Sequence, residues 1–158
     1  MPIGSRWNAQ PYAMRAPEVF LGQPCTAPSG VWAIAAMLLC WIKPGILGVW
    51  DSPHPFINEA WCMAKIKRLF PHWETPGSDT IDDPLLKAAL DSAHRLGEGA
   101  PELQAILGLD AELQRVGIPE QLRDLLRFML VVDPVQRPSA FSVLTSKELK
   151  ALEKVVSV

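Results

Sequence analysis

The chain has 158 residues, of which 49% are hydrophobic and 20% are charged, and its formal net charge is −2. This composition excludes a disordered polar chain, since one sizeable core can be built, and the charge balance excludes an electrostatic nucleic-acid-binding surface. The opening residues carry no signal-peptide pattern, so we expect a protein of the cell interior, cytoplasmic or nuclear.

Proline and glycine divide the chain into predicted elements. Residues 11–28 contain several prolines and predict irregular chain, with a short turn over residues 18–22. Residues 31–42 form an apolar run that Ser29 can cap as a helix. A membrane-spanning helix needs about twenty apolar residues. This shorter run therefore predicts a buried core helix, and we expect no membrane partner.

Helical signals continue through the rest of the chain. Amphipathic spacing predicts a helix over residues 57–70, opened by Asn58. Further helices are expected between proline, aspartate and glycine boundaries, over residues 82–96, 101–107, 118–132, 138–144 and 147–156. No segment shows the period-two alternation of a strand. The sequence therefore predicts a single all-α domain of about six helices.

One carboxylate near the N-terminus needs a partner. Glu18 follows Ala16 and Pro17 and precedes an apolar run, where an unpaired buried charge would be costly. Arg137 lies near the other end of the chain, between a helix-ending turn and a proline, and its planar guanidinium suits a carboxylate. We expect Glu18 and Arg137 to form a structural ion pair. The alternative is two solvated surface charges.

Three stretches together resemble the C-terminal lobe of a eukaryotic-type protein kinase. "APE" (16–18) resembles the element that ends the activation segment. "SGVWAIAAMLLC" (29–40) is similar to the central buried helix of that lobe, and "MLVVDPVQRPSA" (129–140) to the late element whose arginine pairs with the A-P-E glutamate. The resemblance implies one partial kinase-like domain over residues 1–158 without the N-terminal β lobe.

The resemblance also implies the finer organisation of the domain. Arg15, directly before A-P-E, is most similar to the proline-directed and SR-protein kinases, and "CWIKPG" resembles fungal kinase-like sequences. In that group Arg15 would shape a peptide pocket, although a solvated arginine is the alternative. Residues 71–117 would be an insertion between late helices, and residues 147–158 a helical tail.

The parts that carry phosphoryl transfer in that family are absent from the sequence. No glycine-rich phosphate loop, H-R-D loop or D-F-G is present, and Gly30 stands where the family usually has an aspartate. We therefore expect no catalytic, cofactor-binding or metal-binding residue in this chain, Mg-ATP being the cofactor of the full-length family. The chain would be a non-catalytic docking module. The alternative is the C-terminal part of a longer serine/threonine kinase that uses Mg-ATP.

Docking would need an exposed surface. Trp61, on the amphipathic segment 57–70, is the best candidate for binding a protein partner, together with residues 71–117. The alternative is that most tryptophans fill the core. Without the other lobe, the central helix would also keep a bare apolar surface. The remaining chemistry-bearing residues are expected to be reduced, buried thiols, acids at a helix start and loop histidines: Cys25, Cys40, Cys62, Asp79, Asp82, Asp83, His54 and His72.

Overall fold

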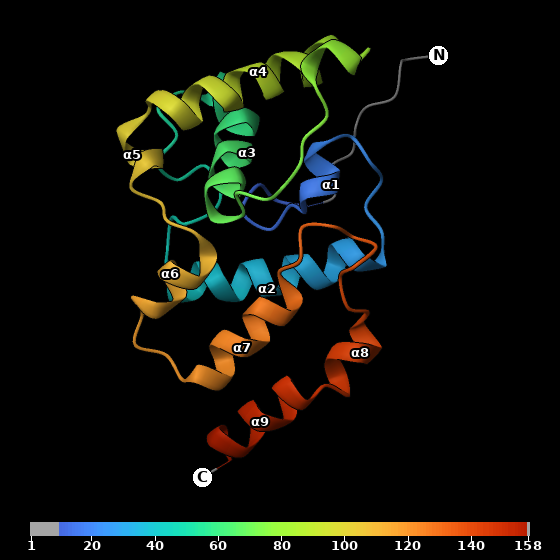
Figure 1. Ribbon diagram of the computed structural model, residues 1–158, viewed down its shortest axis with the longest axis vertical. Coiled ribbons are helices and arrows are strands. Elements are labelled where there is room, and N and C mark those ends of the chain that lie inside the picture. Colours follow the sequence, from blue (N-terminus) through green and yellow to red (C-terminus); the bar gives the residue numbers. More distant parts are fainter. Residues whose placement is uncertain (1–9, 158) are drawn as a thin grey trace.

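The computed structural model describes residues 10–157, so the two ends of the predicted range 1–158 lie outside it. The described chain is all-α and contains no strand, as the sequence predicts. Residues 10–157 form nine α-helices, which are labelled in Figure 1. They are α1 (Pro17–Phe20), α2 (Ala27–Ile42), α3 (Asn58–Leu69), α4 (Pro84–Gly99), α5 (Pro101–Gln104), α6 (Leu109–Gln114), α7 (Glu120–Met129), α8 (Ala140–Leu144) and α9 (Lys147–Val156), with short 3-10 turns η1 (Pro55–Ile57) and η2 (Ser78–Thr80).

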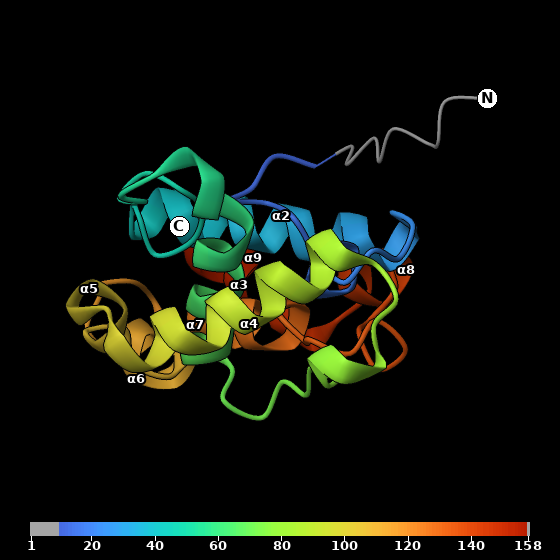
Figure 2. The same cartoon turned by 90° about the horizontal axis from the view of Figure 1, so that it is seen from above.

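The helices are stacked along the long axis of the molecule. In Figure 1, α4 lies at one end, α1 and α3 come next, α2 crosses the middle, and α7, α8 and α9 occupy the other end. The view from above places α2 at the edge opposite α4, α5 and α6 (Figure 2). Helix α9 packs against α7, so the predicted tail is joined to the rest of the fold. Within residues 10–157, no helix is long and apolar enough to cross a membrane.

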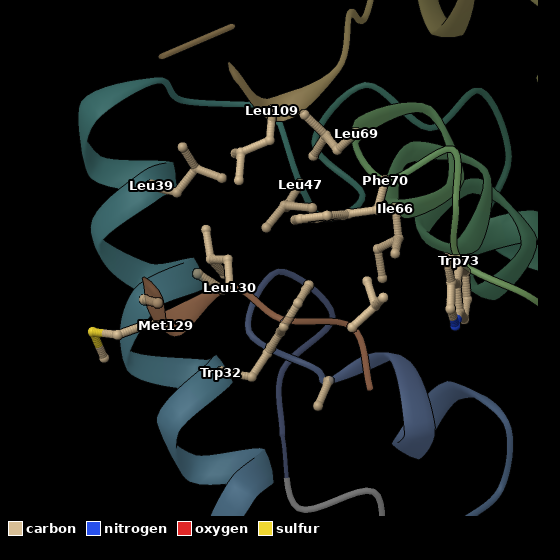
Figure 3. Close-up of a cluster of buried hydrophobic side chains, with 14 of the residues drawn as sticks. Trp32, Leu39, Leu47, Ile66, Leu69, Phe70, Trp73, Leu109, Met129 and Leu130 are labelled. Atoms are coloured by element: carbon tan, nitrogen blue, oxygen red, sulfur yellow. The ribbon is translucent and has the colours of Figure 1, made fainter. Parts of the chain in front are cut away.

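The main core forms where α2, α3, α6 and α7 meet (Figure 3). Trp32 of α2 is fully buried and lies against Phe70, with 5.4 Å between the ring centroids. Leu39 from α2 and Leu126 from α7 are also buried. Burying such side chains contributes about 1.5–3 kcal/mol each. The apolar run 31–42 therefore supplies the central core helix that the sequence predicts.

Helix α2 begins earlier than the predicted start at residue 31. Thr26 is the N-cap residue, and Pro28 lies in the first turn, where proline is favourable. The Ser29 hydroxyl accepts the Thr26 N–H at 3.0 Å from inside the helix. Ser29 therefore supports the cap from the third helical position, and the prediction that it opens the helix was wrong by one turn.

The region between residues 71 and 117 differs most from expectation. Helix α4 runs through Gly97 to Gly99, whereas a stop at Gly97 was predicted. A Cβ at Gly97 would meet nothing within 4 Å, so this glycine does not mark a tight turn. Helix α4 ends instead just before Pro101, because proline disfavours a helical residue ahead of it. Helix α6 was not predicted.

Candidate functional site

Glu18 and Arg137 form the ion pair that the sequence predicts across 119 residues. The two guanidinium nitrogens Nη1 and Nη2 donate to Oε1 and Oε2, each at 2.9 Å, in the bidentate geometry that favours arginine. The side chains of Arg137 and Glu18 are only 0% and 4% exposed. This burial excludes the alternative of two solvated surface charges.

Further groups satisfy the remaining donors and acceptors of this pair. The Ser29 hydroxyl donates to Glu18 Oε1 at 2.9 Å, while Arg137 also donates to the carbonyls of Pro28 and Val131. The guanidinium lies 5.2 Å from the Trp32 ring centroid. Burial raises the pKa of the Glu18 carboxyl, but hydrogen bonds and the charge of Arg137 outweigh it and hold that pKa below its usual range. Because the pair is enclosed and its polar atoms are bonded, its role is structural, and neither side chain has a free group that could react.

Arg15 is buried beside the ion-pair helix α1 and is 7% exposed. Its Nε and Nη2 donate to the Gln10 carbonyl at 3.2 and 3.1 Å, and its guanidinium lies 4.5 Å from the Tyr12 ring and 5.1 Å from the Phe20 ring. A solvated arginine is therefore excluded. Arg15 holds the segment before α1 in place, and the peptide-pocket role that the resemblance implies stays a prediction.

Trp61 cannot be a docking residue, and this prediction was wrong. Its side chain is 2% exposed and packs with Ala64 and Leu103 under α4 and α5. Its indole Nε1 donates to Asp51 Oδ1 at 2.9 Å, and the fully buried Lys65 ammonium lies 2.5 Å from the same oxygen. The amphipathic face predicted for segment 57–70 is not observed, because residues 60–66 of α3 are all buried, and α4 and α5 cover the side that carries Trp61.

The loop after α2 forms one wall of an apolar groove of about 680 Å³. Gly48 has a φ of +80° and approaches the N-terminal segment so closely that an added Cβ would lie 2.9 Å from the Ala13 Cβ. Glycine is therefore required there, because other residues rarely adopt this conformation. The lining residues include Tyr12, Ala13, Cys40, Leu47, Val49 and Trp50.

A line of residues on the outer face of α2 is exposed, apart from the half-buried Gly30. We call it the apolar stripe, and it consists of Ala27, Gly30, Ile34, Met37 and Trp41. Ile34 is 54% exposed, Met37 48% and Trp41 83%. Trp50, in the loop that follows α2, is 89% exposed. Scattered exposed apolar side chains are ordinary, but several on one helix face form a candidate interaction surface.

The other predicted positions show no assembled chemistry. The Asp83 carboxylate accepts the N–H groups of Leu85 and Leu86 as the N-cap of α4, which matches its expected role. Across residues 10–157, no three His, Cys, Asp or Glu side chains come together in a way that could hold a metal. Cys62 is buried, and burial raises the pKa of its thiol to about 12. Cys40 is half-buried and Cys25 is exposed, so the expectation of three buried thiols was wrong for Cys25.

Comparison with known proteins identifies no relative: no family model matches the chain, and no curated protein or solved structure matches it significantly.

The sequence predicted the ion pair but not which tryptophans would be exposed. Trp61 and Trp73 are buried, whereas Trp41 and Trp50 are exposed. A helix that is apolar on every face carries no periodic signal to separate its inner from its outer side. The sequence pointed to this surface in one way: without the other lobe, the central helix was expected to keep a bare apolar surface.

Proposed function

We propose that this chain is a non-catalytic protein-docking module with the architecture of a protein kinase C-terminal lobe. The apolar stripe of α2 is the observation that carries the docking role. Its exposed Ile34, Met37 and Trp41 offer a continuous apolar face that water solvates poorly, and covering it by a partner would be favourable.

The kinase-like part of the proposal is supported by the buried pair of Glu18 and Arg137. Two carboxylate oxygens meet two guanidinium nitrogens, and the partners come from the A-P-E element and the late element of the resemblance. The non-catalytic part is supported by the sequence, which lacks the motifs that bind phosphates and magnesium and that orient the hydroxyl nucleophile.

Site-specific cross-linking tests the docking role. A photo-reactive amino acid is introduced at Met37 or, as a control, at Leu85, which is 80% exposed on α4. Helix α4 is separated from α2 by α1 and α3 in Figure 1. We expect a defined cross-linked species from position 37 in a cell extract and none from position 85. Equal yields from both positions, or no product from position 37, would contradict docking through the stripe.

The second candidate is the C-terminal part of a longer serine/threonine kinase that uses Mg-ATP. The apolar stripe also favours this candidate, since upstream residues of the same polypeptide would cover it. The discriminating observation is the coding sequence upstream of Met1, where a glycine-rich loop and an H-R-D motif would support a kinase. For the chain itself, we expect Mg-ATP to leave the melting temperature unchanged. A rise of several degrees would contradict the non-catalytic role.

A further inference from the structure

We infer that the apolar stripe binds a second copy of this chain, with the two α2 helices packed antiparallel about a two-fold axis near Ile34. This inference rests on the docking role proposed above and names the partner. The stripe residues 27, 30, 34, 37 and 41 are separated alternately by three and four positions. Because α2 is apolar on every face, the exposure of Ile34, Met37 and Trp41 distinguishes this line, and a line with this spacing can pack side by side with another helix.

The stripe is graded in size along the helix, and this gradient favours the antiparallel arrangement. Ala27 and Gly30 are small and lie at the N-terminal end, whereas Met37 and Trp41 are large and lie at the C-terminal end. A Cβ added at Gly30 would meet nothing within 4 Å, so open space lies over the small end. Ala27 and Trp41 are equally far from Ile34 in sequence, so a two-fold axis at Ile34 places each opposite the other.

The absence of charge on α2 is also compatible with a second copy. Helix α2 carries no charged side chain between Ala27 and Ile42. An acidic or basic partner would find no countercharge on it, whereas another α2 offers an equally uncharged surface. In the antiparallel pair, the positive N-terminal end of each helix dipole also lies beside the negative C-terminal end of the other.

The exposed apolar area reaches the size of a small interface when Trp50, in the loop after α2, is counted together with the stripe. Trp41 and Trp50, 83% and 89% exposed, contribute roughly 200 Å² each. The exposed halves of Ile34 and Met37 bring the area to roughly 600 Å² per copy. Complete burial of these four side chains in both copies would cover roughly 1,200 Å², which is the lower limit for a specific interface. This area predicts a weak, reversible dimer.

Disulfide trapping tests the geometry of the dimer. Ile34→Cys is introduced into a chain that carries Cys25→Ser and Cys40→Ala, while the inaccessible Cys62 is kept. Position 34 lies next to its own equivalent across the proposed axis, so mild oxidation should convert most of the protein to a covalent dimer. Leu85→Cys, on the distant α4, should form no disulfide-linked dimer. Ala27→Cys should also form none, because a parallel pair would bring position 27 next to its equivalent but an antiparallel pair would not.

Sedimentation of the unmodified chain provides the second readout. We expect a concentration-dependent dimer, and we expect Trp41→Ser to raise its dissociation constant about tenfold or more, with Leu85→Ser unchanged. Trp41 is mostly exposed, and an unchanged circular dichroism spectrum shows that the variant is folded. A chain that stays monomeric, or equal trapping at positions 34, 27 and 85, would overturn self-pairing. If the chain is monomeric while position 37 cross-links to another protein, docking stands and only the inferred partner is wrong.

Discussion

Asp51 accepts hydrogen bonds from two buried donors through one oxygen. The Lys65 ammonium lies 2.5 Å from Oδ1 and the Trp61 indole nitrogen lies 2.9 Å from it. Lys65 is fully buried and has one further acceptor, the Gly45 carbonyl, at 2.7 Å. Burial raises the pKa of the Asp51 carboxyl, but the hydrogen bonds from Lys65 and Trp61 and the charge of Lys65 together outweigh it and lower that pKa overall. Asp51 therefore holds the loop after α2 against α3.

We expect Asp51→Ala to destabilise the protein by about 2 kcal/mol. The buried Lys65 ammonium loses its counterion, and water that enters the vacated space replaces only part of that interaction. Asp110→Ala is the matched control. Asp110 also bonds a cation, Arg127, but it is 80% exposed, so its removal should cost less than about 1 kcal/mol. Urea unfolding of both variants provides the comparison. Equal losses of unfolding free energy would show that the burial of Lys65 does not raise the cost of removing its counterion.

The Glu18 carboxyl contributes to the acid sensitivity of the fold. Its pKa in the folded protein lies below the ordinary value of 4.5, so the unfolded chain binds a proton more readily. The stabilisation from Arg137 is therefore complete above pH 4.5 and is lost as the pH falls through the folded-state pKa. We expect the native protein to lose more stability than Glu18→Gln between about pH 5 and pH 3. Parallel pH profiles of unfolding free energy would contradict this assignment.

At the scale of single elements, α2 depends on a serine with two tasks. The Ser29 hydroxyl accepts the Thr26 N–H at the start of the helix and donates to Glu18. We expect Ser29→Ala to cost about 2 kcal/mol, because the cap and a buried acceptor are affected together.

Ser139→Ala provides the control for this element. Ser139 caps α8 through the Ser142 N–H, but it contacts no buried charge. Its loss should cost about 1 kcal/mol or less. The ratio of the two values, measured by urea unfolding, separates capping from support of the ion pair. If both substitutions cost the same, the bond between Ser29 and Glu18 contributes little.

Helices with clear end signals could be predicted from the sequence, and those fixed by packing could not. Helix α9 begins and ends at the predicted residues 147 and 156, and α3 lies within the predicted range 57–70. Helix α6 has weaker signals, with Gly108 at its N-cap and Asp110 and Glu112 in its first turn. The Glu112 carboxylate accepts the nearby Leu107 N–H and also bonds Lys43, which is 69 residues away, so a tertiary contact supports this short helix.

At the scale of the whole molecule, the ion pair closes the fold. Glu18 belongs to α1, and Arg137 belongs to the segment between α7 and α8. Both partners also bond the start of α2, through Ser29 and the Pro28 carbonyl. Three separate parts of the chain are therefore joined at one buried point. The charge and spacing of Glu18 and Arg137 made this contact predictable. The exposed side of α2 could not be predicted from the sequence, because both faces of this helix are apolar.

A double-mutant cycle on Glu18→Gln and Arg137→Met tests this closure most directly. Each single variant should lose about 3–5 kcal/mol, because the partner charge stays buried without compensation. The double variant should lose less than the sum by about 2–3 kcal/mol. The exposed pair of Asp110 and Arg127 provides the control cycle, with a coupling below about 1 kcal/mol. Additive losses at Glu18 and Arg137 would contradict the claim that this pair joins the two ends of the chain.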